Sequence, residues 1–262
     1  MAYANNNGVQ IYYEVEGSGE PLLFHHGIAS SGENWVAYTD AFKDSYQCIR
    51  IDARGHGKSD KLQDAEDYRL ELMTSDVVSV LDDLGIEKVN FFGFSMGGFL
   101  GAAMSKYYPN RLKTLMVGGI SPKGAEEGNT INDILKEAFR VGADLGAVEY
   151  INHTEEMFGA WSEQEKASIL SQSKKVFQAY YSALASFQKY DPDCSAEFRA
   201  LTVPKLLYIG EFDEFYSDVA RNGAKEFPNT EVVVFEGMKH TDDYFPVAVP
   251  LLNSFLERHT GT

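Results

Sequence analysis

A serine held between two glycines is the clearest chemical signal in this 262-residue sequence. Residues 93–97 read Gly-Phe-Ser-Met-Gly, directly after the apolar run Lys88–Phe92 and directly before a helical pattern. A sharp turn from strand to helix pushes a serine hydroxyl out of the sheet, and glycines at 93 and 97 leave room for the neighbouring backbone. The motif and its context therefore predict Ser95 as a nucleophile.

A serine hydroxyl is a weak nucleophile at neutral pH and needs an adjacent base. Of the six histidines, His240 is the one on the loop directly after the last strand-like run, Glu231–Phe235, whereas His259 lies in the tail. Loops at the carboxyl ends of parallel strands are where ligands bind in such sheets. An acidic loop follows the preceding run, Lys205–Ile209, and its carboxylates are candidates for orienting the base. These carboxylates are Glu211, Asp213 and Glu214.

Several short apolar runs indicate the strands that must position these side chains. The central runs are continuously apolar, which is typical of strands buried on both faces. Helical patterns alternate with them, so the order predicts an α/β protein with a mostly parallel sheet. The first two runs are too close for a crossover helix, and we expect them to pair antiparallel. The runs are Val9–Val15, Pro21–His25, Gln47–Ile51, Lys88–Phe92, Leu112–Val117, Lys205–Ile209 and Glu231–Phe235.

One long stretch, residues 122–200, carries helical patterns and no strand pattern. We interpret it as an all-helical cap inserted between two late strands, and residues 1–121 with 201–262 as the core domain. Packing against the core explains any single aromatic ring in this stretch, but together the rings favour a lid over an apolar pocket. The candidate pocket residues are Trp35, Phe94, Phe158, Phe187 and Tyr244.

Two further segments extend the pattern. Residues 25–28 read His-His-Gly-Ile after a strand-like run, and residues 52–59 read Asp-Ala-Arg-Gly-His-Gly-Lys-Ser. Together with residues 93–97 they resemble the α/β-hydrolase fold family, specifically its esterase and lactonase-like members with a helical cap. The resemblance covers nearly the whole chain, although the cap region resembles nothing in particular. It implies an eight-stranded, mostly parallel sheet flanked by helices, with an all-helical cap between two late strands.

The resemblance also implies an oxyanion hole made of backbone groups. In that family the loop after the early strand donates one N–H to the oxyanion, and the residue after the nucleophile donates the second. Carried over to this sequence, the donors are the N–H groups of Ile28 and Met96. We interpret His25 and His26 as structural residues of the loop, and residues 52–59 as a structural turn.

The family order of nucleophile, acid and histidine implies Ser95, Asp213 and His240 as the catalytic residues. Asp213 has the usual Gly-X-X-Asp spacing after its strand, while Glu211 and Glu214 remain rivals because their carboxylates suit the same chemistry. The implied reaction is acyl transfer to water through an acyl-enzyme, with no metal and no cofactor.

We therefore expect a serine hydrolase that cleaves a small or medium carboxylic ester or lactone. Two alternatives stay open: a hydrolase that cleaves the carbon–carbon bond of a vinylogous diketone, and a small-molecule-binding protein built on a hydrolase scaffold. Ser95 argues against haloalkane dehalogenases and epoxide hydrolases of this fold, which use an aspartate nucleophile. Peroxide-forming members also carry a serine and are compatible as a side activity.

Composition narrows the partners. The formal net charge is −16 and no run of Lys or Arg is present, which disfavours nucleic acids and anionic membranes as partners. The two cysteines, Cys48 and Cys194, do not suggest a disulfide framework. No secretory signal or membrane-spanning run is visible, so we expect a cytoplasmic protein. The sequence gives no indication of the oligomeric state.

Overall fold

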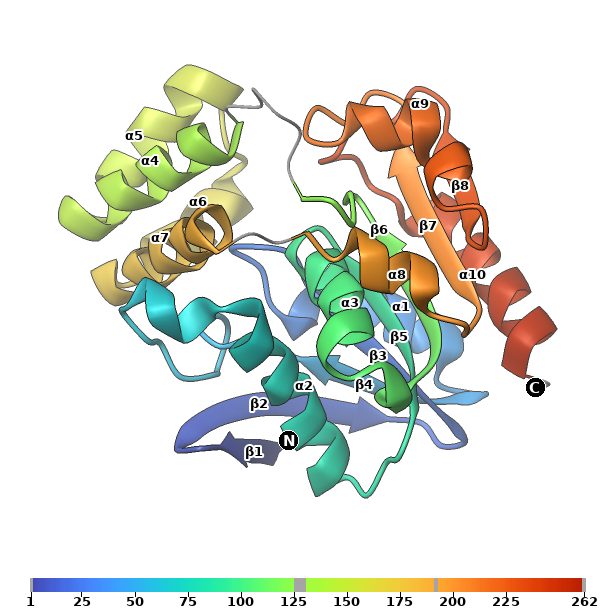
Figure 1. Ribbon diagram of the computed structural model, residues 1–262. Coiled ribbons are helices and arrows are strands. Elements are labelled where there is room, and N and C mark those ends of the chain that lie inside the picture. The colour runs from blue at the N-terminus through green and yellow to red at the C-terminus, as the bar shows by residue number, and fades with distance from the viewer. Residues whose placement is uncertain (1, 125–130, 191–192, 261–262) are drawn as a thin grey trace.

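A computed structural model describes residues 2–124, 131–190 and 193–260, and it contains an eight-stranded sheet (Figure 1). The strand order is β1-β2-β4-β3-β5-β6-β7-β8. All neighbours from β4 to β8 run parallel, whereas β1 and β2 pair antiparallel with each other and β2 pairs antiparallel with β4. The strands are β1 Ala2–Asn6, β2 Val9–Glu16, β3 Glu20–His25, β4 Tyr46–Ile51, β5 Val89–Phe94, β6 Leu112–Gly118, β7 Lys205–Gly210 and β8 Glu231–Phe235.

The expected pairing of the first two apolar runs is wrong. Strand β2 does not pair with β3; it pairs with β4 and with β1, a strand that the apolar patterns did not reveal. Asn7 and Gly8, both with positive φ, close the β1–β2 hairpin, as is typical of an Asn-Gly turn. Strand β3 instead lies between β4 and β5, where parallel neighbours on both sides bury its residues 22–25.

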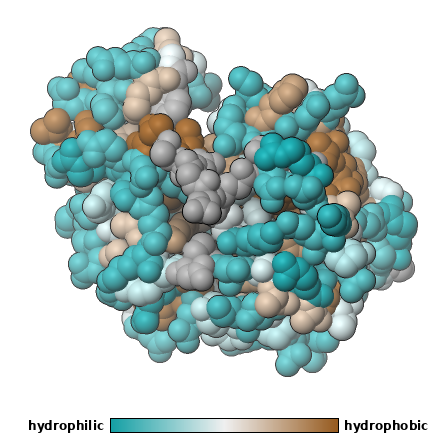
Figure 2. Space-filling view, turned by 45° about the horizontal axis from the view of Figure 1, so that its top comes forward, coloured by the Kyte–Doolittle hydropathy of each residue, from teal (hydrophilic) through white to brown (hydrophobic). Residues whose placement is uncertain are grey.

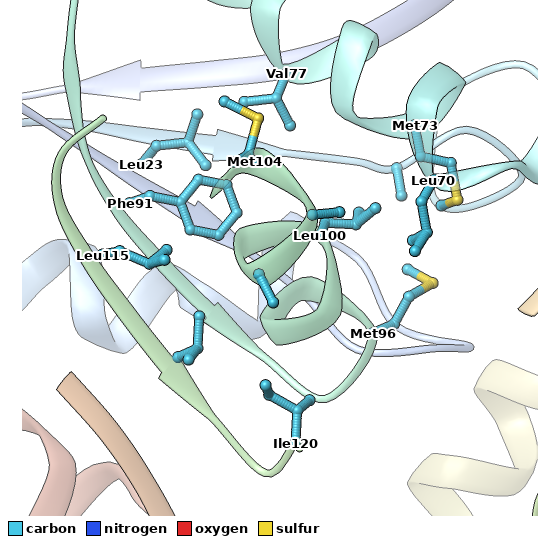
Figure 3. Packing of buried hydrophobic residues seen from close by; sticks show 14 of the residues in the cluster. Leu23, Leu70, Met73, Val77, Phe91, Met96, Leu100, Met104, Leu115 and Ile120 are labelled. Atoms are coloured by element: carbon cyan, nitrogen blue, oxygen red, sulfur yellow. The ribbon is translucent and has the colours of Figure 1, made fainter. Parts of the chain in front are cut away.

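Helices cover both faces of the sheet. Alternate strand residues such as Leu23 and Phe91 pack under α2 and α3, as Figure 3 shows, while Phe24 and Phe92 pack under α1 and α10. The core helices are α1 Val36–Phe42, α2 Leu70–Asp83, α3 Met96–Tyr107, α8 Ser195–Ala200, α9 Ser217–Glu226 and α10 Phe245–Thr260. The short 3-10 helices are Gly32–Trp35, Ala65–Tyr68 and Pro109–Arg111. The α/β class and the mostly parallel eight-stranded sheet are confirmed.

Four helices between β6 and β7 form a separate layer, at the upper left of Figure 1. They share a small apolar core of their own, built around Phe139, Phe177 and Tyr180. Helix α8 also lies between β6 and β7 in sequence, but it packs against α3 and its Phe198 belongs to the core of the sheet. The four helices are α4 Ile131–Asp144, α5 Ala147–Phe158, α6 Glu163–Leu170 and α7 Lys174–Lys189.

Among the described residues, no helix is both long enough and apolar enough to cross a bilayer.

Candidate active site

Ser95 occupies a strained turn between β5 and α3. Its φ of 54° and ψ of −119° are rare for a residue with a side chain. The turn needs glycines on both sides: a Cβ at position 93 would lie 2.2 Å from the Gly97 carbonyl oxygen, and one at position 97 would lie 2.1 Å from the His25 carbonyl oxygen. The Ser95 N–H is anchored on β6 through the Gly118 carbonyl at 2.9 Å. The local sequence thus fixes the serine in one geometry, with the residue half-buried.

A continuous hydrogen-bonded chain runs from this serine. The Ser95 Oγ lies 3.0 Å from His240 Nε2, and His240 Nδ1 lies 2.7 Å from Asp213 Oδ2. A carboxylate accepts hydrogen bonds only, so the imidazole proton sits on Nδ1 and leaves Nε2 free to accept the serine proton. Asp213 is 1% exposed and His240 is 8% exposed, so both groups are largely shielded from water.

The acidic loop after β7 holds three carboxylates, and the structure separates their contacts. Asp213 Oδ1 accepts the N–H groups of Phe215 at 2.9 Å and Tyr216 at 3.0 Å, which leaves Oδ2 for the imidazole. Glu211 accepts the N–H of Gly237 at 2.9 Å. Glu214 accepts the backbone N–H of His240 at 3.3 Å rather than a ring nitrogen. Of the three, it is Asp213 that touches the imidazole in these contacts.

The loop after β3 passes directly beside Ser95. A Cβ added at Gly27 would lie 3.4 Å from Ser95 Cβ and 3.8 Å from Ser95 Oγ. Ile28 follows in the same loop and lines the same cavity as Ser95. On the other side, Met96 begins α3, so its N–H belongs to the first helical turn, where backbone donors have no partner within the helix. Two predicted N–H donors therefore belong to segments that border the serine.

A cavity of about 960 Å³ lies over Ser95 and is bordered by both the sheet domain and helices α4–α7. Four of the predicted pocket residues line it: Trp35, Phe94, Phe187 and Tyr244. Phe158, the fifth, is the last residue of α5, and its side chain lies outside the described part of the structure. In Figure 2, apolar side chains gather where the helical layer on the left meets the rest of the molecule.

Several residues that line this cavity were not predicted from the sequence. Tyr38 lies one helical turn beyond Trp35, and that spacing was the available signal for it. Tyr208 lies on β7, where an aromatic residue reads as ordinary strand core. Helix α7 contributes Phe177 and Tyr180. The cavity is thus more strongly aromatic, and richer in phenol groups, than the sequence indicated.

Three buried histidines lie beneath the Gly27 loop. His26 donates from Nδ1 to the Gly27 carbonyl at 2.7 Å and accepts the Ala53 N–H on Nε2 at 3.0 Å, which holds it neutral. Burial and the neighbouring His26 lower the pKa of His25 to about 3. Burial also places the pKa of His56 well below its ordinary value. These rings support the loop in their uncharged form.

This cluster predicts loss of stability in mild acid. An unfolded histidine takes up a proton below about pH 6.5, whereas these folded ones do not, so the free energy of unfolding falls as pH drops from about 6.5 towards the folded pKa. At pH 5 each such histidine should cost about 2 kcal/mol. Urea unfolding of the protein and of His56→Gln at pH 7 and pH 5 measures this, with a shallower pH dependence expected for the variant. Equal stability of the native protein at both values would contradict the prediction.

Within residues 2–124, 131–190 and 193–260, no three His, Cys, Asp or Glu side chains are grouped so that they could hold a metal ion. Both cysteines, Cys48 and Cys194, are buried and are not joined in a disulfide.

Comparison with known proteins defines the class. Residues 20–140 match the family model described as alpha/beta hydrolase fold. The chain is similar to that family over these residues and has its fold, an eight-stranded, mostly parallel sheet flanked by helices.

Two relatives that align with most of the chain are each 26% identical to it. A non-heme chloroperoxidase of Kitasatospora aureofaciens is 26% identical over 251 residues, covering 89% of this chain and 90% of the relative. A 3-oxoadipate enol-lactonase of Acinetobacter baylyi is 26% identical over 213 residues, covering 80% of this chain and 78% of the relative. Among solved structures, a thermophilic esterase from Thermogutta terrifontis superposes with a TM-score of 0.78 at 21% identity, covering 98% of each chain.

Proposed function

We propose that this protein is a serine hydrolase of small or medium carboxylic esters or lactones. Ser95 would be the nucleophile, His240 the general base, and Asp213 the residue that orients the base. The observation that carries the proposal is the unbroken chain from Ser95 Oγ through His240 to Asp213, at 3.0 Å and 2.7 Å, set on a strained turn at the cavity.

The first half of the reaction forms an acyl-enzyme. His240 Nε2 takes the Ser95 proton as Oγ attacks the carbonyl carbon, and the carbonyl oxygen becomes an oxyanion. The N–H groups of Ile28 and Met96 stabilise that charge, each contributing about 3–4 kcal/mol to the transition state. Asp213 stays ionised, holds the proton on Nδ1 and stabilises the imidazolium. His240 then gives its proton to the leaving alcohol oxygen, and the ester bond breaks.

The second half repeats the same steps with water. His240 takes a proton from a water molecule, whose oxygen attacks the acyl carbon. The oxyanion forms again at the same two N–H groups, and the Ser95 oxygen leaves as it recovers its proton from His240. The products are the alcohol and the carboxylic acid, or a single hydroxy acid when the substrate is a lactone.

The shape and chemistry of the cavity support an ester or lactone with an apolar part. Its lining is largely aromatic and aliphatic, as is usual for small-molecule sites. A structural neighbour is an esterase and a relative is an enol-lactonase, while another relative is a chloroperoxidase. The similarity to the esterase and the enol-lactonase supports hydrolysis of an acyl compound. The individual substrate is left to experiment.

A panel of purified-protein assays tests the proposal. We expect nitrophenyl esters from acetate to decanoate to be hydrolysed with an optimum at intermediate chain length, because the cavity is finite, and simple lactones to be opened. A vinylogous diketone cleaved at least about 100-fold more efficiently than any ester would favour carbon–carbon bond hydrolysis instead. Tight binding of such ligands with no turnover would favour the binding-protein alternative.

A further inference from the structure

Three aromatic side chains with polar atoms form one wall of the cavity. Trp35 and Tyr38 lie around the start of α1, and Tyr208 comes from β7. All three rings pack around Phe92, with centroid separations of 5.0 Å for Trp35, 5.7 Å for Tyr38 and 5.9 Å for Tyr208. Their mutual packing fixes them as one rigid surface.

The polar atoms of this wall have no hydrogen-bond partner among the residues that the structure describes. Trp35 Nε1 is buried without a hydrogen-bond partner, and no hydrogen bond in the described ranges uses the hydroxyl of Tyr38 or Tyr208. Buried tyrosines away from the cavity differ: the Tyr46 hydroxyl pairs with Thr260 Oγ1 at 3.3 Å, and that of Tyr68 donates to a carbonyl at 2.8 Å. An unpaired buried donor such as Trp35 Nε1 is costly, and Tyr38 and Tyr208 add two donors at the cavity without a protein partner, so the group points to a ligand that pairs with them.

The chemistry of the wall defines what the ligand must offer. Burial raises the pKa of Tyr38 and Tyr208, so both phenols stay protonated and can donate at neutral pH. The carboxylate of Asp243 adds to the rise in the Tyr38 pKa, and Asp242 and Asp243 both line the cavity. A carboxylate on the ligand would be repelled there. The matching group is therefore an uncharged oxygen acceptor such as a ketone, ether or hydroxyl.

The wall also lies beside the catalytic groups. The Phe94 ring packs on Tyr208 at 6.1 Å between centroids and on His240 at 5.1 Å. A substrate whose ester carbonyl meets Ser95 can therefore place another part of its chain against the wall. The wall can therefore contact a second functional group of the substrate, separated from the ester carbonyl by a few bonds.

We propose that Trp35, Tyr38 and Tyr208 form an acceptor subsite that selects esters or lactones carrying a second, uncharged oxygen. This inference rests on the proposed function, since it assumes that Ser95 attacks the ester group of the same molecule. It narrows the substrate class from apolar acyl compounds to neutral, oxygen-bearing ones.

Matched esters test the subsite. Hexanoate is compared with 4-oxohexanoate and 5-oxohexanoate as 4-nitrophenyl esters, and pentyl acetate with 4-oxopentyl acetate, each corrected for its rate with hydroxide. We expect one oxo compound to exceed its parent in kcat/KM by about 5- to 10-fold, as a neutral hydrogen bond provides. In Tyr38→Phe and Tyr208→Phe that ratio of oxo compound to parent should fall towards one, whatever the change in the rate on the parent ester itself. Tyr46→Phe, a control in the same core, should keep the native ratio.

Ratios near one for every pair in the native protein, or ratios unchanged in both phenylalanine variants, would overturn the subsite even with full esterase activity. Binding separates this failure from failure of the proposed function. Both tryptophans, Trp35 and Trp161, line the cavity, so the fluorescence of Ser95→Ala reports binding without turnover. Methyl 4-oxopentanoate should bind about 5-fold more tightly than methyl pentanoate, and equal affinity would overturn the subsite.

Discussion

The Ser95→Ala variant should hydrolyse the best ester about 10⁶-fold more slowly in kcat, with KM little changed. The methyl group has no lone pair to attack the carbonyl, and the hydrogen bond to His240 Nε2 at 3.0 Å is lost. The cavity and its N–H donors remain, so substrate still binds. Initial rates at saturating ester, measured with high enzyme concentration, give kcat.

A matched serine controls for packing effects in that experiment. Ser105 lies in the same helix, α3, and is buried, but its hydroxyl bonds only to the Ala102 carbonyl in the described contacts. We expect Ser105→Ala to keep kcat within about 2-fold, because it makes no contact with the reacting groups. Activity of Ser95→Ala above about 1% of native would mean that another group attacks the ester.

Asp213→Asn should lower kcat/KM by about 10⁴-fold. An asparagine amide can donate towards His240 Nδ1, which favours the tautomer whose proton sits on Nε2. That proton would point at Ser95 Oγ and block the base. The kcat/KM of the variant and of the native protein, measured on the best ester from pH 6 to pH 9, gives the loss.

The rival carboxylates provide the controls. Glu211→Gln removes a charge that contacts the Gly237 N–H, and Glu214→Gln one that contacts the His240 backbone N–H. Each should cost less than about 10-fold in kcat/KM, because Nδ1 of His240 is bonded to Asp213. A larger loss in Glu214→Gln than in Asp213→Asn would transfer the orienting role to Glu214.

The strained turn at Ser95, the candidate nucleophile, could be predicted from the sequence because its signal is local. A serine at φ 54° needs glycines on both sides, and residues 93 and 97 record that requirement directly. The candidate base, His240, and the candidate acid, Asp213, were predicted from their order along the chain, because each follows a late strand at the same edge of the sheet. Which of three carboxylates reaches His240 depends on loop geometry, and only the fold separates Asp213 from Glu211 and Glu214.

Other features depended on contacts that no local pattern records. Strand β1, Ala-Tyr-Ala-Asn-Asn, contains no large aliphatic residue and lies at the sheet edge, so it lacks the apolar signature of a buried strand. Strand β3 lies between β4 and β5, and a pairing of strands distant in sequence leaves no local pattern. The free phenols of Tyr38 and Tyr208 were equally hidden, because a missing hydrogen-bond partner is visible only once the chain is folded.

The most direct test of the account is covalent labelling of the folded protein with a fluorophosphonate, followed by peptide mass spectrometry. If His240 activates Ser95 as the structure suggests, one adduct should form on the peptide that contains residue 95. It should be absent in Ser95→Ala and form far more slowly in Asp213→Asn. A folded native protein that stays unlabelled at Ser95, or reacts at a different serine, would contradict the proposed mechanism.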